Sequence, residues 1–249
     1  MRPFLLAFLI SSATFFSAGS LRAQRVIDVT NADAVQMGKG LPVAVSGGEP
    51  FSMAKFVRVT AGTPFFYEGW MRGMLVLGSG KAYANLLIRI NLLDNTVIYQ
   101  DANGQELIAT TPLRRIMLRD SITGKEYNFV LGSEMNNAEK SYLKIWFQVL
   151  VNDRISLCKQ LRKTILENTP YGSATTEQTI STTDIYFVYK DGQLIPIKKW
   201  SEFLDVFSDR KDKMSPFVST NHLRGRSEQD YIQVVNYYNS LLKGLSALR

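Results

Sequence analysis

The feature that most constrains the fold is a series of short apolar–polar alternations between residues 56 and 131, separated by turn residues. The clearest lies at 82–92, where alternate residues are apolar and would share one face of a strand: Ala84, Leu86, Ile88, Ile90 and Leu92. The expected strands begin near residues 72, 82, 96, 105, 114 and 126, which are 9 to 14 residues apart. Because this spacing leaves no room for crossover helices, it predicts an antiparallel meander.

Residues 142–166 are compatible with two structures. As one helix, they would place their apolar residues on a single stripe. As two strands, the arms 145–151 and 155–161 would flank a turn at Asn152-Asp153. Periodicity alone does not decide between them, but the turn pair and the aromatic, β-branched first arm favour a hairpin.

A second hairpin is predicted at 185–197, where two apolar arms are separated by Asp191 and Gly192. An Asp-Gly pair readily adopts the positive φ angles of a tight turn. Pro196 in the second arm has no N–H to donate, which predicts an edge strand. The preceding polar residues 168–183 are rich in Thr, Ser and Gly, and they predict a loop.

The periodicity becomes helical after residue 200. Ser201 is expected to cap a short helix, and 209–221 is expected to form a second one that Pro216 interrupts. Ser227, with Asp230 three residues later, is a weaker form of the capping box that opens a helix. The apolar stripe of this third helix is Tyr231, Val234, Val235, Tyr238, Leu241, Leu242 and Leu245.

The amino-terminal residues 1–23 have the pattern of an export signal. Arg2 provides the basic start, an apolar stretch runs from Phe4 to Phe16, and small residues precede a cleavage position at Ala23. The stretch is short and rich in hydroxyl groups, whereas a membrane span needs about 20 apolar residues. We therefore expect a mature chain from Gln24 that is periplasmic or secreted and not an integral membrane protein. An uncleaved amino-terminal anchor is the alternative.

Together these patterns predict an α+β fold. Antiparallel hairpins are expected over roughly 56–198 and short helices over roughly 200–246. The expected organisation is a signal peptide at 1–23, a β-rich domain at 24–198, and a helical segment at 199–249 that packs on it.

The formal net charge is +7, and it falls to +5 without residues 1–23. In an exported protein, a basic excess points toward lipid headgroups or acidic glycans rather than nucleic acid. In the alternative interpretation, a net charge this small only keeps the protein soluble and has no role in binding. No nucleic-acid partner is therefore expected.

Few side chains are suited to catalysis, since the chain has one histidine, His222, and one cysteine, Cys158. His222 lies in a polar connection between helices, and the sequence has no Gly-x-Ser-x-Gly motif. A zinc site needs several His or Cys ligands, so neither a metal site nor a cofactor is predicted. Cys158 has apolar neighbours and is expected to be buried. No catalytic residue is assigned, although paired carboxylates leave no sequence signature. The carboxylates open to such a role are Glu49, Glu68, Glu106 and Glu126.

The clearest candidate binding surface is an aromatic run with four large rings in six residues: Phe65, Phe66, Tyr67 and Trp70. Such rings can form a stacking platform for sugars or a hydrophobic contact patch. In the alternative interpretation, alternate rings enter the core and Gly69 lets the strand bend.

Several short motifs lie along the mature chain: Glu68-Gly69-Trp70 with Gly73, Gly80-Lys81-x-Tyr83, Tyr171-Gly172-Ser173, and Val235-Asn236-Tyr237-Tyr238-Asn239-Ser240-Leu241. In this order they resemble a family of exported bacterial proteins of unknown function. The resemblance spans most of the mature chain and implies export. It lends no activity, ligand or catalytic residue.

These observations favour a non-enzymatic, exported binding or assembly protein of the bacterial cell envelope. An envelope protein or a glycan is the expected partner. Two alternatives stay open: a carrier of a small apolar ligand in the β-rich half, and a glycan hydrolase that uses paired carboxylates.

Overall fold

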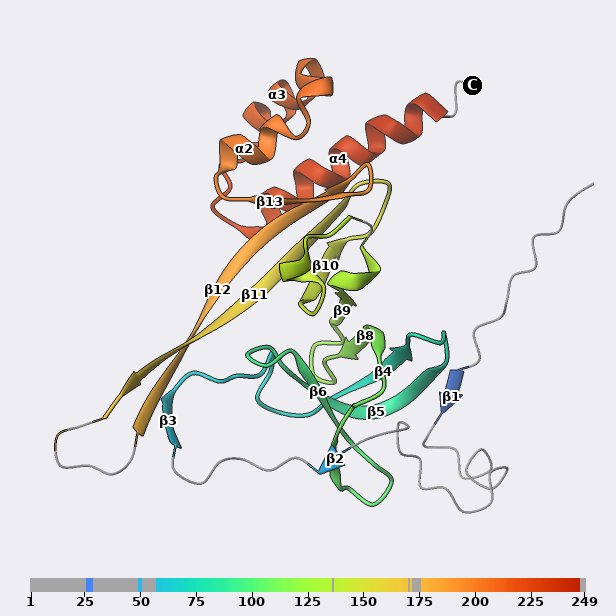
Figure 1. Ribbon diagram of the computed structural model, residues 1–249. Coiled ribbons are helices and arrows are strands. Elements are labelled where there is room, and N and C mark those ends of the chain that lie inside the picture. Colours follow the sequence, from blue (N-terminus) through green and yellow to red (C-terminus); the bar gives the residue numbers. More distant parts are fainter. Residues whose placement is uncertain are drawn as a thin grey trace, which may run out of the picture.

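The computed structural model describes residues 26–28, 49–50, 57–135, 137–169, 171 and 176–246 of the 249-residue chain. The predicted signal peptide at 1–23 lies outside the described residues. Figure 1 shows a curved sheet with the carboxyl-terminal helices gathered at one end, at the top of the view. The α+β class is confirmed, because a mostly antiparallel sheet precedes the helices.

The predicted strands between residues 71 and 131 are all present, and each begins within one residue of its expected start. Their bounds are β4 Met71–Leu77, β5 Ala82–Asn91, β6 Thr96–Gln100, β7 Glu106–Ile108, β8 Leu113–Arg119 and β9 Glu126–Leu131. In β8 buried residues of one face alternate with more exposed residues of the other, as period-two patterning requires. β6 instead buries three consecutive residues, Val97, Ile98 and Tyr99.

The strand order departs from a simple meander, because β8 pairs with β4 rather than with β7. Along the sheet the order is β13-β12-β11-β10-β9-β8-β4-β5-β6-β7-β2. Two short strands pair in parallel beside this path, β1 (Val26–Asp28) with β5 and β3 (Val57–Ala61) with β12. The edge strand β2 is Glu49–Pro50.

The hairpin interpretation of residues 142–166 is confirmed. β10 (Trp146–Val151) pairs antiparallel with β11 (Ser156–Asn168). The loop predicted at 168–183 is wrong over most of its length, because β12 (Thr176–Lys190) already begins within it. Its polar composition misled the prediction because β11 and β12 extend beyond the core as a ribbon whose side chains are mostly exposed. Figure 1 shows this ribbon running from the helices to the lower left.

The second predicted hairpin is also confirmed. Asp191 and Gly192 both have positive φ, 51° and 75°, as a tight turn between twisted strands requires. The second arm is β13 (Gln193–Ile197), which lies at one end of the sheet order. Pro196 therefore occupies an edge strand, where its missing N–H is tolerated.

The helices are α2 (Trp200–Asp205), α3 (Lys211–Thr220) and α4 (Glu228–Ser246). Ser201 does not cap α2, which has Lys199 at its N-cap and no side-chain cap. Pro216 does not interrupt α3, because it removes only one internal hydrogen bond at an exposed position. The predicted cap of α4 is present, since Ser227 Oγ accepts a bond from the Asp230 N–H.

Buried side chains form three clusters. The sheet core fills the curved part of the sheet and contains Leu75, Tyr83, Leu86, Ile88, Ile116, Leu118, Phe129 and Trp146. The helical core joins β10–β13 to the helices through Leu157, Val188, Phe203, Phe207, Val234, Val235 and Tyr238. The outer cluster is Met135, Phe147, Cys158 and Phe187, with Ala138, Tyr142 and Ile145 packed on it.

Polar contacts also tie the helices to the sheet. The ammonium group of Lys159 in β11, largely buried, pairs with Asp184 of β12 and with Glu228 at the start of α4. Lys190 at the end of β12 donates to Asp209 at 2.9 Å, and Tyr238 of α4 donates to the same carboxylate at 2.7 Å. These bonds fix the position of α4 against the sheet.

Candidate functional site

The structure splits the aromatic run between the core and the surface. Phe65 is buried, and Phe66 packs edge-to-face against Tyr127 and Phe129 with ring centroids 5.0 and 4.9 Å apart. Tyr67 is half exposed, and Trp70 is partly buried. The four rings therefore do not share one flat face, and their role in binding stays a prediction.

Arg89 of β5 explains part of this arrangement. Its guanidinium lies 3.7 Å from the centroid of the Phe65 ring and 5.3 Å from that of Trp70. The Nε of Arg89 is buried without a hydrogen-bond partner among the described residues. Two of the predicted rings thus hold an arginine by cation–π contact.

A different surface combines the features of a binding site, and it lies on the outer face of the sheet, opposite the sheet core. In β8, Ile116 and Leu118 face the core, so Arg115, Met117 and Arg119 point to the outer face. The pairings with β4 and β9 then place nine residues in three rows across these strands: Arg72–Arg119–Glu126, Met74–Met117–Asn128 and Val76–Arg115–Val130.

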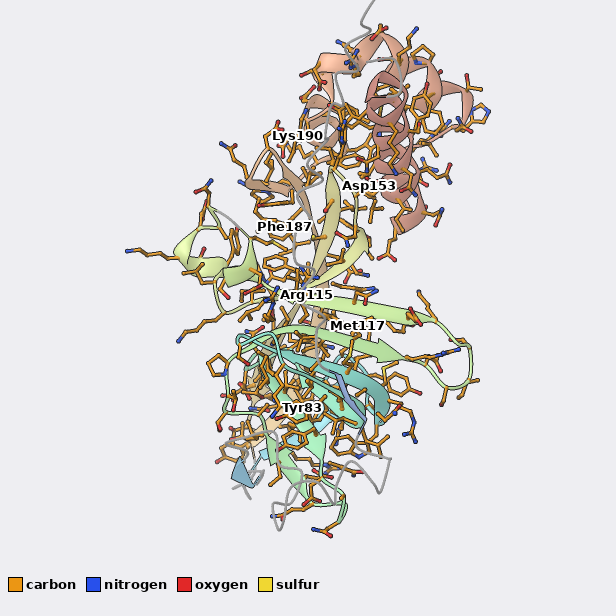
Figure 2. All side chains as sticks on the ribbon, turned by 90° about the vertical axis from the view of Figure 1, so that its right-hand side faces the viewer. Tyr83, Arg115, Met117, Asp153, Phe187 and Lys190 are labelled. Carbon is orange, nitrogen blue, oxygen red and sulfur yellow. The ribbon has the colours of Figure 1, made fainter. Side chains whose placement is uncertain are left out.

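Part of this face forms a groove of about 530 Å³, which we call the arginine groove. Its lining residues are Arg72, Gly73, Met74, Ala84, Asn85, Met117, Leu118, Arg119, Ser121, Glu126 and Asn128. Figure 2 places Met117 and Arg115 between Phe187 of the outer cluster and Tyr83 of the sheet core. Met135, Ala138, Tyr142 and Ile145 cover the outer face over Phe147 and Phe187, but no described segment covers it over the arginine groove.

The backbone of the arginine groove departs from regular sheet geometry. Opposite Met74 of β4, β5 carries one extra residue, so the ladder shifts between Gly73 and Leu75. The extra residue is accommodated by Asn85, whose φ of 60° lies in the left-handed region. On the other side of β4, a Cβ atom at Gly73 would lie 2.2 Å from the carbonyl oxygen of Met117. The close approach of β4 and β8 therefore requires glycine.

The electrostatics of the groove are unbalanced. Arg72 and Arg119 are directly opposite each other on β4 and β8. Arg115 lies on the same face of β8, four residues before Arg119, with the Met117 row between them. Among the described side chains, none forms an ion pair with these three arginines. Among the described residues, their one side-chain hydrogen bond is long, 3.5 Å, and runs from the Arg72 guanidinium to the Asn85 carbonyl oxygen.

A second groove, of about 570 Å³, continues the arginine groove toward β10 and β11. Both are lined by Met117 and Asn128, and the second groove adds Arg115, Val130, Glu134, Val149, Cys158 and Tyr189 among others. Burial raises the pKa of Cys158 to about 12, so the thiol is protonated near neutral pH. As predicted, Cys158 is buried, and it is not an activated nucleophile.

A third groove, of about 510 Å³, lies on the helices and includes His222. Leu204, Phe207, Met214 and Val218 form much of its wall, and Asp205 is its one carboxylate. His222 follows α3 with a φ of 53°, in the polar connection where the sequence placed it.

The candidate carboxylates are not gathered into one site. Glu106 on β7 and Glu126 on β9 are separated by four strands in the sheet order. Glu49 pairs with Ile108 at the edge strand, and Glu68 is exposed beside the aromatic run. Of the four, Glu126 alone lines the arginine groove. Among the described residues, no group of three His, Cys, Asp or Glu side chains could hold a metal ion.

The residues of the arginine groove were missed because their significance depends on pairing between distant strands. Arg72 and Arg119 are 47 positions apart, and each has the spacing of an ordinary solvent-facing strand residue. One usable signal was the pattern Leu113–Arg119 itself, in which the outward positions 115, 117 and 119 are Arg, Met and Arg.

Comparisons with protein-family models, with curated proteins and with solved structures found no match to this chain. None of the helices in the described part of the chain is long and apolar enough to cross a membrane.

Proposed function

We propose that this protein is a non-enzymatic, exported binding protein of the bacterial cell envelope, and that its ligand is an amphipathic anion held in the arginine groove. The ligand class is an apolar chain that ends in a carboxylate or a phosphate. Export rests on the predicted signal peptide at 1–23, and the basic net charge of the chain is consistent with an anionic ligand.

The observation that carries the proposal is the direct opposition of Arg72 and Arg119 on paired strands. Like charges directly across a strand pair repel each other, and no described carboxylate forms an ion pair with either. An anion between the two guanidinium groups removes this repulsion and accepts charge-assisted hydrogen bonds from both. The planar donor arrangement of arginine suits carboxylate and phosphate oxygens.

The apolar half of the ligand is assigned to Met74 and Met117. These side chains lie in the next row of the same face, and Met117 is 39% exposed. Thioether side chains are flexible and polarizable, so they adapt to an alkyl chain of variable shape. A volume of about 530 Å³ lies in the usual range for small-molecule sites. The second groove provides a continuation for a longer chain.

The alternatives have less support. Each of the three grooves described above is lined by one carboxylate residue, whereas glycoside hydrolysis needs two. The interior of the β-rich half is occupied by the large side chains of the sheet core, several of them fully buried. An apolar ligand therefore finds its space on the outer face of the sheet rather than inside it.

Isothermal titration calorimetry with decanoate and octyl phosphate tests the proposal. The controls are inorganic phosphate, which lacks the chain, and octyl glucoside, which lacks the charge. We expect both amphipathic anions to bind at least about tenfold more tightly than either control, a difference of about 1.4 kcal/mol. Stronger binding of octyl phosphate would point to a phosphate headgroup, and stronger binding of decanoate to a free carboxylate.

Two charge-removing variants locate the site. Arg72→Gln and Arg119→Gln should each weaken binding at least about tenfold, because each removes hydrogen bonds to a charged group. Lys213→Gln on α3 is the matched control, since it removes one exposed positive charge away from the groove. Binding that survives both arginine substitutions, or that is absent for both ligands, contradicts the proposal.

A further inference from the structure

We propose that two copies of this chain associate through the outer edge of β11, residues 162–168, as antiparallel strands centred on Ile165. This proposal is independent of the arginine groove. An uncovered strand edge exposes a row of unpaired N–H and C=O groups, which is a ready template for another strand. The question is therefore which edges of the β11–β12 ribbon other described elements cover.

The other edge of the ribbon, the outer edge of β12, is paired at both of its ends. β13 pairs with β12 from Tyr186 to Lys190, and β3 pairs with β12 from Thr176 to Thr179. On the β11 side, β10 reaches only to Lys159. Beyond it, β11 continues to Asn168 while pairing with β12 alone among the described strands. Figure 1 shows this part of the ribbon extending away from the helices.

The sequence of this edge is complementary to itself in one register. When Ile165 faces Ile165 of the second copy, Lys163 faces Glu167 of the second copy, and Glu167 faces its Lys163. The twofold relation therefore forms the charge pair twice around a central apolar pair. Opposite charges and β-branched apolar pairs at directly opposed positions both stabilise antiparallel strands.

Neighbouring registers lack this complementarity. Centring the pair on Thr164 places Lys163 opposite Ile165, and centring it on Leu166 places Glu167 opposite Ile165. In both cases a charged side chain faces an apolar one and no charge pair forms. The register centred on Ile165 is thus specified by side chains rather than by the backbone, which would accept any register.

The two charged side chains are already held on one face of the ribbon. Lys163 Nζ donates to Thr182 Oγ1 at 2.9 Å, and Glu167 Oε1 accepts from Gln178 Nε2 at 2.7 Å. An ammonium group has three donors and a carboxylate has a second oxygen, so each retains capacity for a partner. On the opposite face the register also places Thr164 against Leu166, which is 72% exposed in the single chain.

A lysine on a strand edge often prevents pairing with another chain. Here Glu167 lies four residues from Lys163 in the same strand and on the same face, so a second copy supplies the opposite charge at the same level. Residues 162–168 also lack proline and glycine, the residues that most weaken a strand. The edge is therefore suited to a partner of its own sequence.

Sedimentation velocity on the purified protein tests the association. We expect a concentration-dependent dimer in the micromolar range, since a pairing of seven residues lies at the small end of specific interfaces. Lys163→Glu and Glu167→Lys should each weaken self-association at least tenfold, because each places like charges opposite each other twice. Arg162→Glu is the matched control, because it reverses a charge at a position that faces neutral Asn168.

The decisive experiment mixes the two self-repelling variants. In a mixed dimer every pair is again opposite in charge, so Lys163→Glu and Glu167→Lys together should dimerise with the affinity of the unmodified protein. A protein that remains monomeric at 0.2 mM, about two hundred times a dissociation constant of 1 µM, overturns the proposal. So does a dimer that neither variant weakens, or a mixture that fails to associate.

A cysteine cross-link tests the register independently of charge. Ile165→Cys places two thiols at directly opposed positions, within the reach of a disulfide, and mild oxidation should join the two copies. Thr164→Cys is the control, because it faces Leu166 and should give little cross-linked dimer. Equal cross-linking of the two variants overturns the register centred on Ile165.

Discussion

The side chain of Asn239 in α4 forms two hydrogen bonds with the backbone of one residue, Ile155. Its Oδ1 accepts from the Ile155 N–H at 3.0 Å, and its Nδ2 donates to the Ile155 carbonyl oxygen at 2.9 Å. Both groups are buried, so the amide replaces the strand partner that Ile155 lacks between β10 and β11. This contact fastens the last helix to a hairpin 84 residues earlier in the chain.

Replacing Asn239 by alanine is therefore expected to destabilise the fold strongly. It leaves a buried N–H and a buried C=O unpaired, each of which costs about 1–3 kcal/mol. We expect the free energy of unfolding to fall by about 2–4 kcal/mol in urea denaturation. Asn236→Ala, at an exposed position of α4, should change it by less than about 0.5 kcal/mol. Equal effects of the two substitutions would contradict this role.

Gly73→Ala should disturb the sheet at the arginine groove. The added Cβ would lie 2.2 Å from the Met117 carbonyl oxygen, so β4 and β8 must separate. A loss of about 2–4 kcal/mol of stability is expected from this overpacking. Gly78→Ala is the control at the end of β4, because its nearest atom would lie at an ordinary contact distance of 3.6 Å. Thermal denaturation of the two variants gives the comparison.

Substitutions of the buried and the exposed rings of the aromatic run should differ in their cost to stability. Phe66→Ala removes a ring packed edge-to-face against Tyr127 and Phe129, and it should cost about 3 kcal/mol. Tyr67→Ala removes a half-exposed ring, and its cost should stay below about 1 kcal/mol. Urea denaturation measures both. Because the Tyr67→Ala protein should stay folded, a comparison of its glycan binding with that of the unmodified protein tests whether this ring contributes to binding.

Cys158 should react only when the chain unfolds. Because burial raises its pKa to about 12, almost no thiolate exists at pH 8 in the folded protein. We expect iodoacetamide to leave the native protein unmodified over hours and to alkylate it fully in 6 M guanidinium chloride. Mass spectrometry distinguishes the two states, and rapid alkylation of the folded protein would show that the thiol is accessible.

The same thiol should make stability depend on alkaline pH. The unfolded chain loses the Cys158 proton near its ordinary pKa of about 8.5, while the folded chain keeps it until about pH 12. The contribution of this group to stability is therefore complete below about pH 8.5 and is lost as the pH rises toward 12. The Cys158→Ala protein has no thiol and does not lose stability in this way. The difference in the free energy of unfolding between it and the unmodified protein should therefore become smaller above pH 9. Denaturation curves at pH 7 and pH 10 test the sign.

Much of the local structure was predictable, because short-range chemistry determines it. Alternating residues define β5 and β8, Asp191 and Gly192 adopt the turn expected of them, and Ser227 with Asp230 opens α4. Each of these elements depends on residues within a few positions of one another. The prediction that Pro216 interrupts α3 was wrong, because a packed helix tolerates the loss of one hydrogen bond at an exposed position.

The sequence by itself thus determined the α+β class, the positions of most strands and the last helix. Tertiary structure alone decided that β8 lies beside β4, which brings Arg72 opposite Arg119 and creates the arginine groove. It also decided that β12 is the one described strand that pairs with residues 162–168 of β11. The physical reason is that periodicity reports which face of a strand is buried. Which strand becomes its neighbour depends on how the whole core closes.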